Sequence, residues 1–319
     1  MPARRFMKWL GGACLAVGLA GCQPASKPVQ MGAGKAASVT KPQRIVSLNL
    51  CTDQLLLQLV EPQRIAAISK LAHDPELSAL EPQARALTAV RGDTEEVLLL
   101  KPDLVLVGAY TARYTSQMLR DLGFRVVEIP LAHKLEEVIA QTELVAEAVG
   151  EPERGQALIQ TIREQEQALR TATQDDPKPW PIAAERSWQG YSTGKGAMMD
   201  ELLQLAGYRN AGVLAGLNGY GYLPLERLVE TQPDLMMTPD YARKVPSVEP
   251  REKLHPALAN TSLNETILPT RMTICGGYWS LQVARTLAQR KSASYCGPCK
   301  KPDLGTVSGG CLPGCCWWP

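Results

Sequence analysis

Apolar residues in this chain alternate between short runs typical of buried strands and longer stretches with helical spacing. Alternating strands and helices are expected at residues 44–49, 52–60, 64–69, 95–100, 103–107, 116–122 and 125–129. Continuous apolar strands separated by helices are typical of a parallel sheet that helices cover on both faces. Ligands of such sheets bind beyond the carboxyl ends of the strands, so we expect a binding edge there.

A long helical pattern at residues 152–173 separates this block from a second one. Pro152 suits a first helical turn, and a helix of this length spans about 33 Å. The second block has expected strands at 182–186, 234–238, 265–268 and 272–274, and helices at 197–206, 225–231 and 279–290. The pattern predicts an α/β fold in which two Rossmann-like lobes with parallel sheets are joined by one long interdomain helix.

The first 22 residues have the layout of a bacterial export signal. Arg4, Arg5 and Lys8 precede an apolar run that is shorter than the ~20 residues needed to span a bilayer. The stretch Leu19-Ala20-Gly21-Cys22 is similar to the lipobox of bacterial lipoproteins, which implies that Cys22 carries a lipid. We expect residues 23–41 to be a flexible tether, and the protein to be lipid-anchored in the periplasm or at the outer surface of the cell envelope. A plain secretory signal is the alternative.

Charge and histidine content exclude several classes of function. The formal net charge is +2, and removing the three leader cations leaves −1, so no basic excess favours nucleic acid. The three histidines, His73, His133 and His255, are not paired at a metal-binding spacing. The chain has no nucleophile motif of the GxSxG type. We therefore expect no enzyme activity, no metal site and no resident cofactor.

One sequence element occurs in both blocks. Glu95 and Glu226 each precede a proline by seven residues, and each proline is followed by Asp-Leu at the start of an expected strand. An acidic residue at a helix N-terminus is favoured by the helix dipole, and this explains either copy alone. Two copies at the same offset predict two similar lobes, each with an exposed carboxylate.

From about Arg44 to Gln289 the chain resembles the periplasmic binding proteins that deliver iron siderophores, haem and vitamin B12. The resemblance rests on the stretches PQRIVSLNLCTDQLLLQLV, EEVLLLKPDLVLVGAY and LERLVETQPDLMMT. It implies a monomeric receptor that works with the permease and ATPase of an ABC importer, with Glu95 and Glu226 docking onto permease arginines. It divides the chain into an N-terminal lobe at 42–150, a connecting helix at 151–175, a C-terminal lobe at 176–291 and a tail at 292–319.

The resemblance also implies where a ligand is held. The expected ligand-binding residues are Arg91, Tyr110, Arg113, Trp188, Tyr191, Tyr220 and Trp279. Arginine suits the anionic oxygens of an iron chelate, and flat aromatic side chains suit a siderophore or a corrin. The haem-binding branch carries a tyrosine shortly before its first docking glutamate, and residues 87–93 contain none. A ferric siderophore is therefore the first expectation, and cobalamin or another corrinoid is the alternative.

The nine cysteines raise a further question, because five of them lie within residues 291–319. Cys296-Gly297-Pro298-Cys299 is similar to the thioredoxin redox motif but lacks its strand and helix context. A frame-altered or read-through tail is our preferred interpretation. An exported thiol-redox or metal-binding protein that acts through the tail is the competing hypothesis. We expect Cys51 and Cys275 to be buried free thiols, with a disulfide as the alternative.

Overall fold

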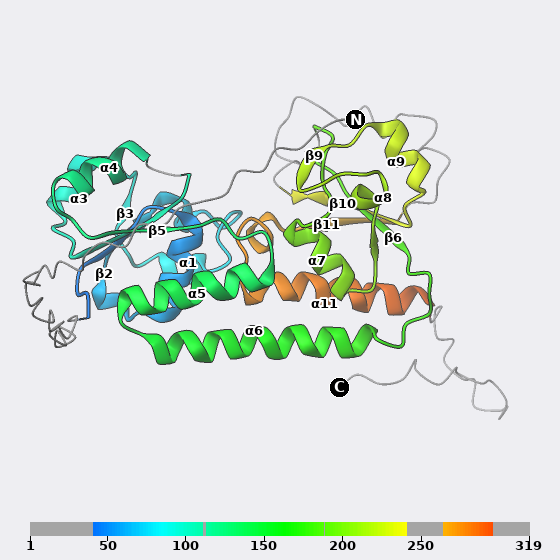
Figure 1. The fold of residues 1–319 in the computed structure, drawn as a ribbon, viewed down its shortest axis with the longest axis horizontal. Helices are drawn as coiled ribbons and strands as arrows, with labels where there is room; N and C mark the ends of the chain where they lie inside the picture. Colours follow the sequence, from blue (N-terminus) through cyan, green and yellow to red (C-terminus); the bar gives the residue numbers. More distant parts are fainter. Residues whose placement is uncertain (1–40, 111–112, 188, 241–263, 296–319) are drawn as a thin grey trace, which may run out of the picture. The chain divides into compact units, whose positions relative to one another are not determined.

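The computed structural model describes residues 41–110, 113–187, 189–240 and 264–295 (Figure 1). The expected export signal, the lipidation site Cys22, nearly all of the tether, Trp188 and the cysteines of the tail lie outside these residues. The residues from Thr40 onward form one compact unit that contains both expected sheets. Within the described part of the chain, no helix is both long enough and apolar enough to cross a membrane.

The first sheet is parallel and has the strand order β3-β2-β1-β4-β5. Its strands are β1 (Ile45–Ser47), β2 (Ile65–Ser69), β3 (Ala89–Val90), β4 (Leu104–Gly108) and β5 (Val126–Ile129). Its helices are α1 (Leu50–Leu59), α2 (Glu81–Ala84), α3 (Thr94–Leu99), α4 (Arg113–Asp121) and α5 (Leu135–Val149), with 3-10 turns at Pro62–Arg64 and Lys70–His73. The predicted strands and helices of this block are confirmed to within a few residues, and α2, β3 and α5 are elements that the pattern did not predict.

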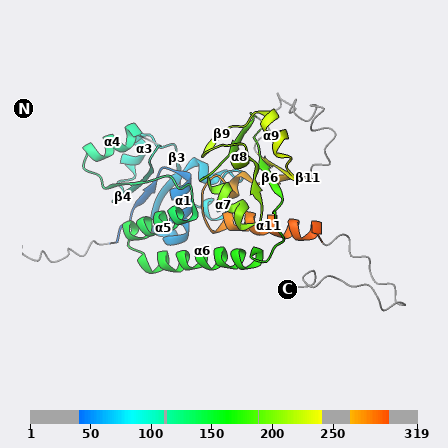
Figure 2. The ribbon, with the colours of Figure 1, turned by 45° about the vertical axis from the view of Figure 1, so that its right-hand side comes forward.

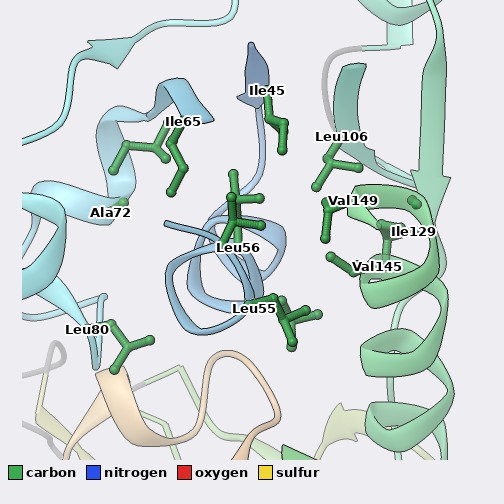
Figure 3. Close-up of a cluster of buried hydrophobic side chains, with 14 of the residues drawn as sticks. Ile45, Leu55, Leu56, Ile65, Ala72, Leu80, Leu106, Ile129, Val145 and Val149 are labelled. Carbon is green, nitrogen blue, oxygen red and sulfur yellow. The ribbon is translucent and has the colours of Figure 1, made fainter. Parts of the chain in front are cut away.

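Both faces of this sheet are buried, as its continuous apolar strands predict. Figure 3 shows Ile45 and Leu106 from the strands, Leu56 from α1 and Val149 from α5 within one hydrophobic cluster. Alternate residues such as Val105 lie in a separate cluster. Successive side chains of a strand point to opposite faces, so a strand buried on both sides needs an apolar residue at every position.

The second sheet is also parallel and has the order β11-β10-β6-β8. Its strands are β6 (Ile182–Glu185), β8 (Arg209–Asn210), β10 (Leu235–Pro239) and β11 (Asn264–Leu268). A separate two-stranded antiparallel sheet pairs β7 (Tyr191–Thr193) with β9 (Tyr220–Tyr222). Its helices are α7 (Met198–Leu205), α8 (Ala211–Leu214), α9 (Leu225–Thr231) and α11 (Tyr278–Tyr295).

Two expectations for this block are corrected. The strand expected at 272–274 is wrong, because Thr270–Met272 forms a 3-10 turn. Asp240 holds this turn, since its Oδ1 accepts from both the amide (2.8 Å) and the hydroxyl (2.6 Å) of Thr270. Helix α11 runs to Tyr295, beyond the expected helix end at Arg290, because no glycine or proline interrupts residues 278–295.

Helix α6 (Pro152–Thr173) has the predicted bounds, and it lies along α5 and α11 (Figures 1 and 2). The approach to α5 is closest at Gly155, where an added Cβ would lie 2.4 Å from the Cβ of Ala146. Helix α5 itself contributes to two cores. Its first half, including Val138, packs in the cluster of the second sheet, and its last turn, including Val149, packs in that of the first.

The expectation that Cys51 and Cys275 are free thiols is wrong, because they form a disulfide. The two residues are 224 positions apart in the sequence, yet their Cα atoms are 5.3 Å apart. Cys275 is buried in the hydrophobic cluster of the first sheet, and Cys51 packs against that cluster. The pairing follows from tertiary packing, which the spacing of cysteines along the chain does not reveal.

Candidate functional site

Polar side chains gather after the carboxyl ends of strands in the first sheet. Arg91 follows β3 and is exposed, and its backbone amide donates to Glu96 Oε2 at 2.7 Å. Tyr110 follows β4, with 78% of its surface exposed. Helix α4 is tied to the turn after β3 because the Thr115 hydroxyl donates to the Gly92 carbonyl oxygen at 2.9 Å. Arg113, in the first turn of α4, is also exposed, so three predicted ligand residues belong to this edge.

Exposed apolar side chains also occur on α4. Tyr114 and Met118 lie four residues apart within this helix, and each is more than half exposed. Residues four apart lie on the same face of a helix. The sequence prediction did not include Tyr114.

Three tyrosines form a cluster on the small antiparallel β7–β9 sheet of the second lobe. The rings of Tyr191 and Tyr220 stack with centroids 5.4 Å apart and an interplanar angle of 10°. The ring of Tyr222 meets Tyr191 edge-on at 6.2 Å. The exposed fraction is 40% for Tyr191, 65% for Tyr220 and 57% for Tyr222. These side chains therefore form a surface patch rather than a core. Tyr222 was not predicted, although Tyr220 and Tyr222 share one face of a strand by two-residue alternation.

Hydrogen bonds hold the β7–β9 sheet to the carboxyl end of β6. Glu185 ends this strand, and its carboxylate accepts from the Thr193 hydroxyl at 2.6 Å, while its carbonyl oxygen accepts from the Ser192 hydroxyl at 2.6 Å. Burial raises the pKa of Glu185 above its usual range, against the lowering effect of the hydrogen bond from Thr193. The buried Arg186 donates to the Leu223 carbonyl oxygen at 3.3 Å. The tyrosines therefore stand on a framework that holds them at the edge where parallel sheets bind ligands.

Gly190 permits this close approach of the β7–β9 sheet to the end of β6. It has φ +82°, and an added Cβ would lie 2.7 Å from the Tyr222 ring and 3.0 Å from an Arg186 guanidinium nitrogen. A side chain at this position would therefore clash as well as strain the backbone.

Trp279 is buried, unlike the other predicted ligand residues that the structure describes. Trp279 is only 2% exposed, lies in the cluster of the first sheet, and donates from Nε1 to the Cys275 carbonyl oxygen at 2.9 Å. A tryptophan whose N–H and ring are both satisfied inside the protein has no free surface for a ligand. We therefore leave Trp279 out of the ligand set proposed below.

Glu95 and Glu226 occupy equivalent places in the two lobes. Each is exposed in the first turn of a short helix, α3 or α9. Six residues later the backbone turns left-handed, at Lys101 (φ 48°) and Gln232 (φ 49°). The repeated sequence element therefore specifies the same helix ending in both lobes.

The aspartate of each repeat copy fastens its helix to the neighbouring central strand. Asp103 accepts from the backbone amides of Gln43 (2.6 Å) and Arg44 (2.9 Å) before β1. Asp234 accepts from the amide of Ile182 at the start of β6 at 2.7 Å. Both glutamates are thus placed by the same local structure relative to their sheets.

Among the described residues, no group of three or more His, Cys, Asp or Glu side chains is arranged to hold a metal ion. His73 is half-buried beside α1, and His133 is exposed before α5. His255 lies outside the described residues. The chemistry of these two sheet edges is therefore that of exposed aromatic rings, two arginines and hydrogen-bonding side chains.

Comparison with known proteins identifies relatives with this architecture. A curated relative, the uncharacterized ABC transporter substrate-binding lipoprotein YvrC of Bacillus subtilis, is 28% identical over 167 residues. That match covers 50% of this chain and 52% of the relative, so the chain spans about half the length of the curated protein it matches.

Solved structures share the fold over most of the chain. The periplasmic haem-binding protein RhuT from Roseiflexus sp. RS-1 has a TM-score of 0.64 at 22% identity, covering 79% of this chain and 98% of that one. The periplasmic haem-binding protein HutB of Vibrio cholerae has a TM-score of 0.66 at 20% identity, covering 78% and 98%. The periplasmic vitamin B12-binding protein BtuF of Vibrio cholerae has a TM-score of 0.61 at 19% identity, covering 80% and 98%.

A family model described as periplasmic binding protein matches residues 45–258, which include both α/β lobes up to β10. This range contains both sheet edges, both repeat copies and the connecting helix described above. The chain belongs to the periplasmic binding protein family.

Proposed function

We propose that this protein is the lipid-anchored, extracytoplasmic solute-binding component of an ABC importer, that it is no enzyme, and that its ligand is a ferric siderophore-type iron complex. The observation that carries the proposal is the cluster of three exposed tyrosines at the carboxyl edge of the second sheet. A solvent-facing stack of rings that a buried framework holds in place is suited to a large, partly apolar ligand.

The first lobe adds the charge that distinguishes between ligands. Arg91 after β3 and Arg113 in α4 are exposed cations of the first lobe, and Tyr110 after β4 is an exposed ring. Guanidinium groups bind carboxylate and other anionic oxygens through paired N–H donors. An iron complex with anionic chelating oxygens would use the arginines of one lobe and the tyrosines of the other.

A corrinoid is the second candidate, and Tyr222 is the observation that favours it. The edge-on third ring extends the aromatic patch beyond the stacked pair. A wide aromatic surface suits the flat face of a corrin ring. The solved relatives named for haem and vitamin B12 are consistent with a flat ligand, although at 19–22% identity they carry the fold alone.

Calorimetric titration of the full-length protein with a ferric hydroxamate, a ferric catecholate, cyanocobalamin and haemin tests both candidates. We expect saturable binding of one ferric siderophore class. Tyr191→Ala and Tyr220→Ala should each weaken that binding about tenfold, because truncating an aromatic anchor costs on the order of 1–2 kcal/mol. Leu122→Ala, which removes an exposed apolar side chain elsewhere, is the matched control and should leave the affinity unchanged.

Binding of cyanocobalamin or haemin alone would replace the siderophore proposal with the corresponding ligand class. Binding of an iron complex with the same affinity in wild type and both tyrosine variants would exclude the β7–β9 sheet from the ligand site. No binding of any of the four compounds by folded protein would count against the proposed ligand set as a whole.

A further inference from the structure

We propose that the Cys51–Cys275 disulfide is a covalent staple between the two lobes, formed after export, which confines their relative movement. The inference does not depend on which solute the protein carries. It rests on the rigid attachment of each cysteine to a different lobe and on the packing around the bond.

Cys51 moves with the first sheet. It lies in the first turn of α1, directly after the central strand β1. The Asn49 side-chain oxygen accepts from the amides of Cys51 (3.0 Å) and Thr52 (3.4 Å), which caps the helix. The hydroxyls of Ser47 and Thr52 share a hydrogen bond of 2.6 Å between strand and helix. Displacing Cys51 would therefore require breaking the junction of β1 and α1.

Cys275 moves with the second sheet. It lies between the 3-10 turn at Thr270–Met272, which Asp240 ties to the end of β10, and the start of α11. Its carbonyl oxygen accepts from Trp279 Nε1 at 2.9 Å and from the Ser280 hydroxyl at 3.3 Å. These bonds hold Cys275 against the first turn of α11.

The segment that carries Cys275 is packed too tightly to move by itself. An added Cβ at Gly276 would lie 2.3 Å from Val138 of α5, and one at Gly277 would lie 2.4 Å from the Trp279 ring. Cys275 and Trp279 are buried in the hydrophobic cluster of the first sheet, although the rest of α11 packs with the second. The disulfide therefore lies where a segment of the second lobe enters the hydrophobic core of the first lobe.

The chemistry of disulfide formation indicates an oxidising partner and the kind of compartment in which the bond forms. Two thiols lose two protons and two electrons as the S–S bond forms, and the disulfide of an envelope thiol oxidase accepts them and becomes a dithiol. Such bonds form and persist in oxidising compartments outside the cytoplasm. Cys275 is 3% exposed once the protein has folded, so folding then protects the bond from exchange.

The first test is the state of the cysteines in the full-length protein after natural export. Digestion without reductant, followed by mass spectrometry, should yield a peptide pair linked through Cys51 and Cys275. Recovery of Cys51 as a free, alkylated thiol, or joined to a cysteine of residues 296–316, would overturn the proposal.

The second test is hydrogen exchange of the ligand-free protein, which a failure of the proposed transport function would not affect. In Cys51→Ala/Cys275→Ala, amides of residues 272–280 should exchange at least about tenfold faster than in wild type, because removing a cross-link favours local opening. Val149→Ala is the matched control, since it disturbs the same hydrophobic cluster without touching the bond, and it should keep the wild-type rate at these amides.

Equal exchange rates of residues 272–280 in the double variant and wild type would show that packing alone holds this segment in place. That result would overturn the proposal that the disulfide confines the lobes. If the double variant does not fold, wild-type protein reduced by a dithiol under native conditions provides the same comparison. Faster exchange after reduction supports the staple, and unchanged exchange of the verified dithiol form contradicts it.

Discussion

At the scale of single residues, one buried polar side chain links a helix to the first sheet. Asp53 is fully buried on α1, where its carboxylate accepts from the hydroxyl (2.5 Å) and the amide (3.2 Å) of Ser69 at the end of β2. Burial raises the pKa of Asp53 to about 7, although hydrogen bonds from Ser47 and Ser69 act in the opposite direction. In the folded protein, burial therefore favours the protonated form of Asp53 up to about pH 7, whereas the hydrogen bonds from the two serines favour the ionised form.

This shift predicts a pH-dependent stability. In the unfolded chain Asp53 ionises near 3.8, the ordinary pKa of an aspartate, and in the folded protein near 7, so the folded protein holds the proton more tightly between these values. The free energy of unfolding should therefore fall as the pH rises from about 4 to 7, by an amount on the order of a few kcal/mol. Below about pH 4 and above about pH 7, the ionisation of Asp53 does not change the free energy of unfolding further.

Asp53→Asn isolates the effect because it removes the titration and keeps an acceptor for Ser69. Urea unfolding at pH 4, 5.5, 7 and 8 should show a flatter profile for the variant, which should be the more stable protein at pH 8. Asp121→Asn, at an exposed carboxylate, is the control and should keep the wild-type slope. Parallel pH profiles for wild type and Asp53→Asn would refute the assignment to this residue.

At the scale of secondary structure, the pair α5–α6 shows how a small residue determines helix packing. Gly155 lies in the first turns of α6, where glycine is unfavourable by roughly 1 kcal/mol relative to alanine. It lies against Ala146 of α5, with no room for a methyl group between the helices. At position 155, the close packing of α6 against α5 therefore outweighs the unfavourable helix propensity of glycine.

Gly155→Ala should for this reason destabilise the protein despite its better helix propensity. Overpacking a tight contact costs about 1–3 kcal/mol, which exceeds the gain of roughly 1 kcal/mol from propensity at the upper end of that range. Chemical denaturation should show a net loss of stability. Thr161→Ala, an exposed position on the same helix, is the control and should be neutral or slightly stabilising. A more stable Gly155→Ala variant would mean that α5 and α6 separate easily.

At the scale of the whole molecule, the proposed transport cycle requires each lobe to present a docking charge. Glu95 and Glu226 are exposed, and the same repeated element places them in the two lobes. Charges of this kind determine the orientation of an encounter more than its affinity. Reversing both should therefore affect delivery to the permease and leave solute capture intact.

Glu95→Lys/Glu226→Lys should reduce solute uptake by cells at least about tenfold, since like charges across an interface cost several kcal/mol. Solute affinity of the purified variant should stay within about twofold of wild type. Glu153→Lys is the matched control, because Glu153 is also an exposed glutamate in the first turn of a helix. Normal uptake by the double variant would contradict the docking role, whereas a parallel loss of solute binding would indicate that the glutamates belong to the ligand site.

The sequence by itself determined the features that depend on neighbouring residues. Apolar runs located the strands, the 22-residue periodic pattern located α6, and the two Glu…Pro-Asp-Leu copies located equivalent turns in the two lobes. These signals are local because strand alternation, helix periodicity and turn formation are decided over a few residues. The predicted ligand residues Arg91 and Tyr110, which follow β3 and β4, also lie at the sheet edge that the parallel topology implies.

Only the tertiary structure decided which distant residues meet. It paired Cys51 with Cys275, placed Trp279 in a core rather than on a ligand surface, and set Tyr222 against Tyr191. It also divided α5 between two hydrophobic clusters. These outcomes depend on how the two blocks of the sequence pack together. Burial of apolar surface is non-directional, so the linear pattern does not specify which distant residues come into contact.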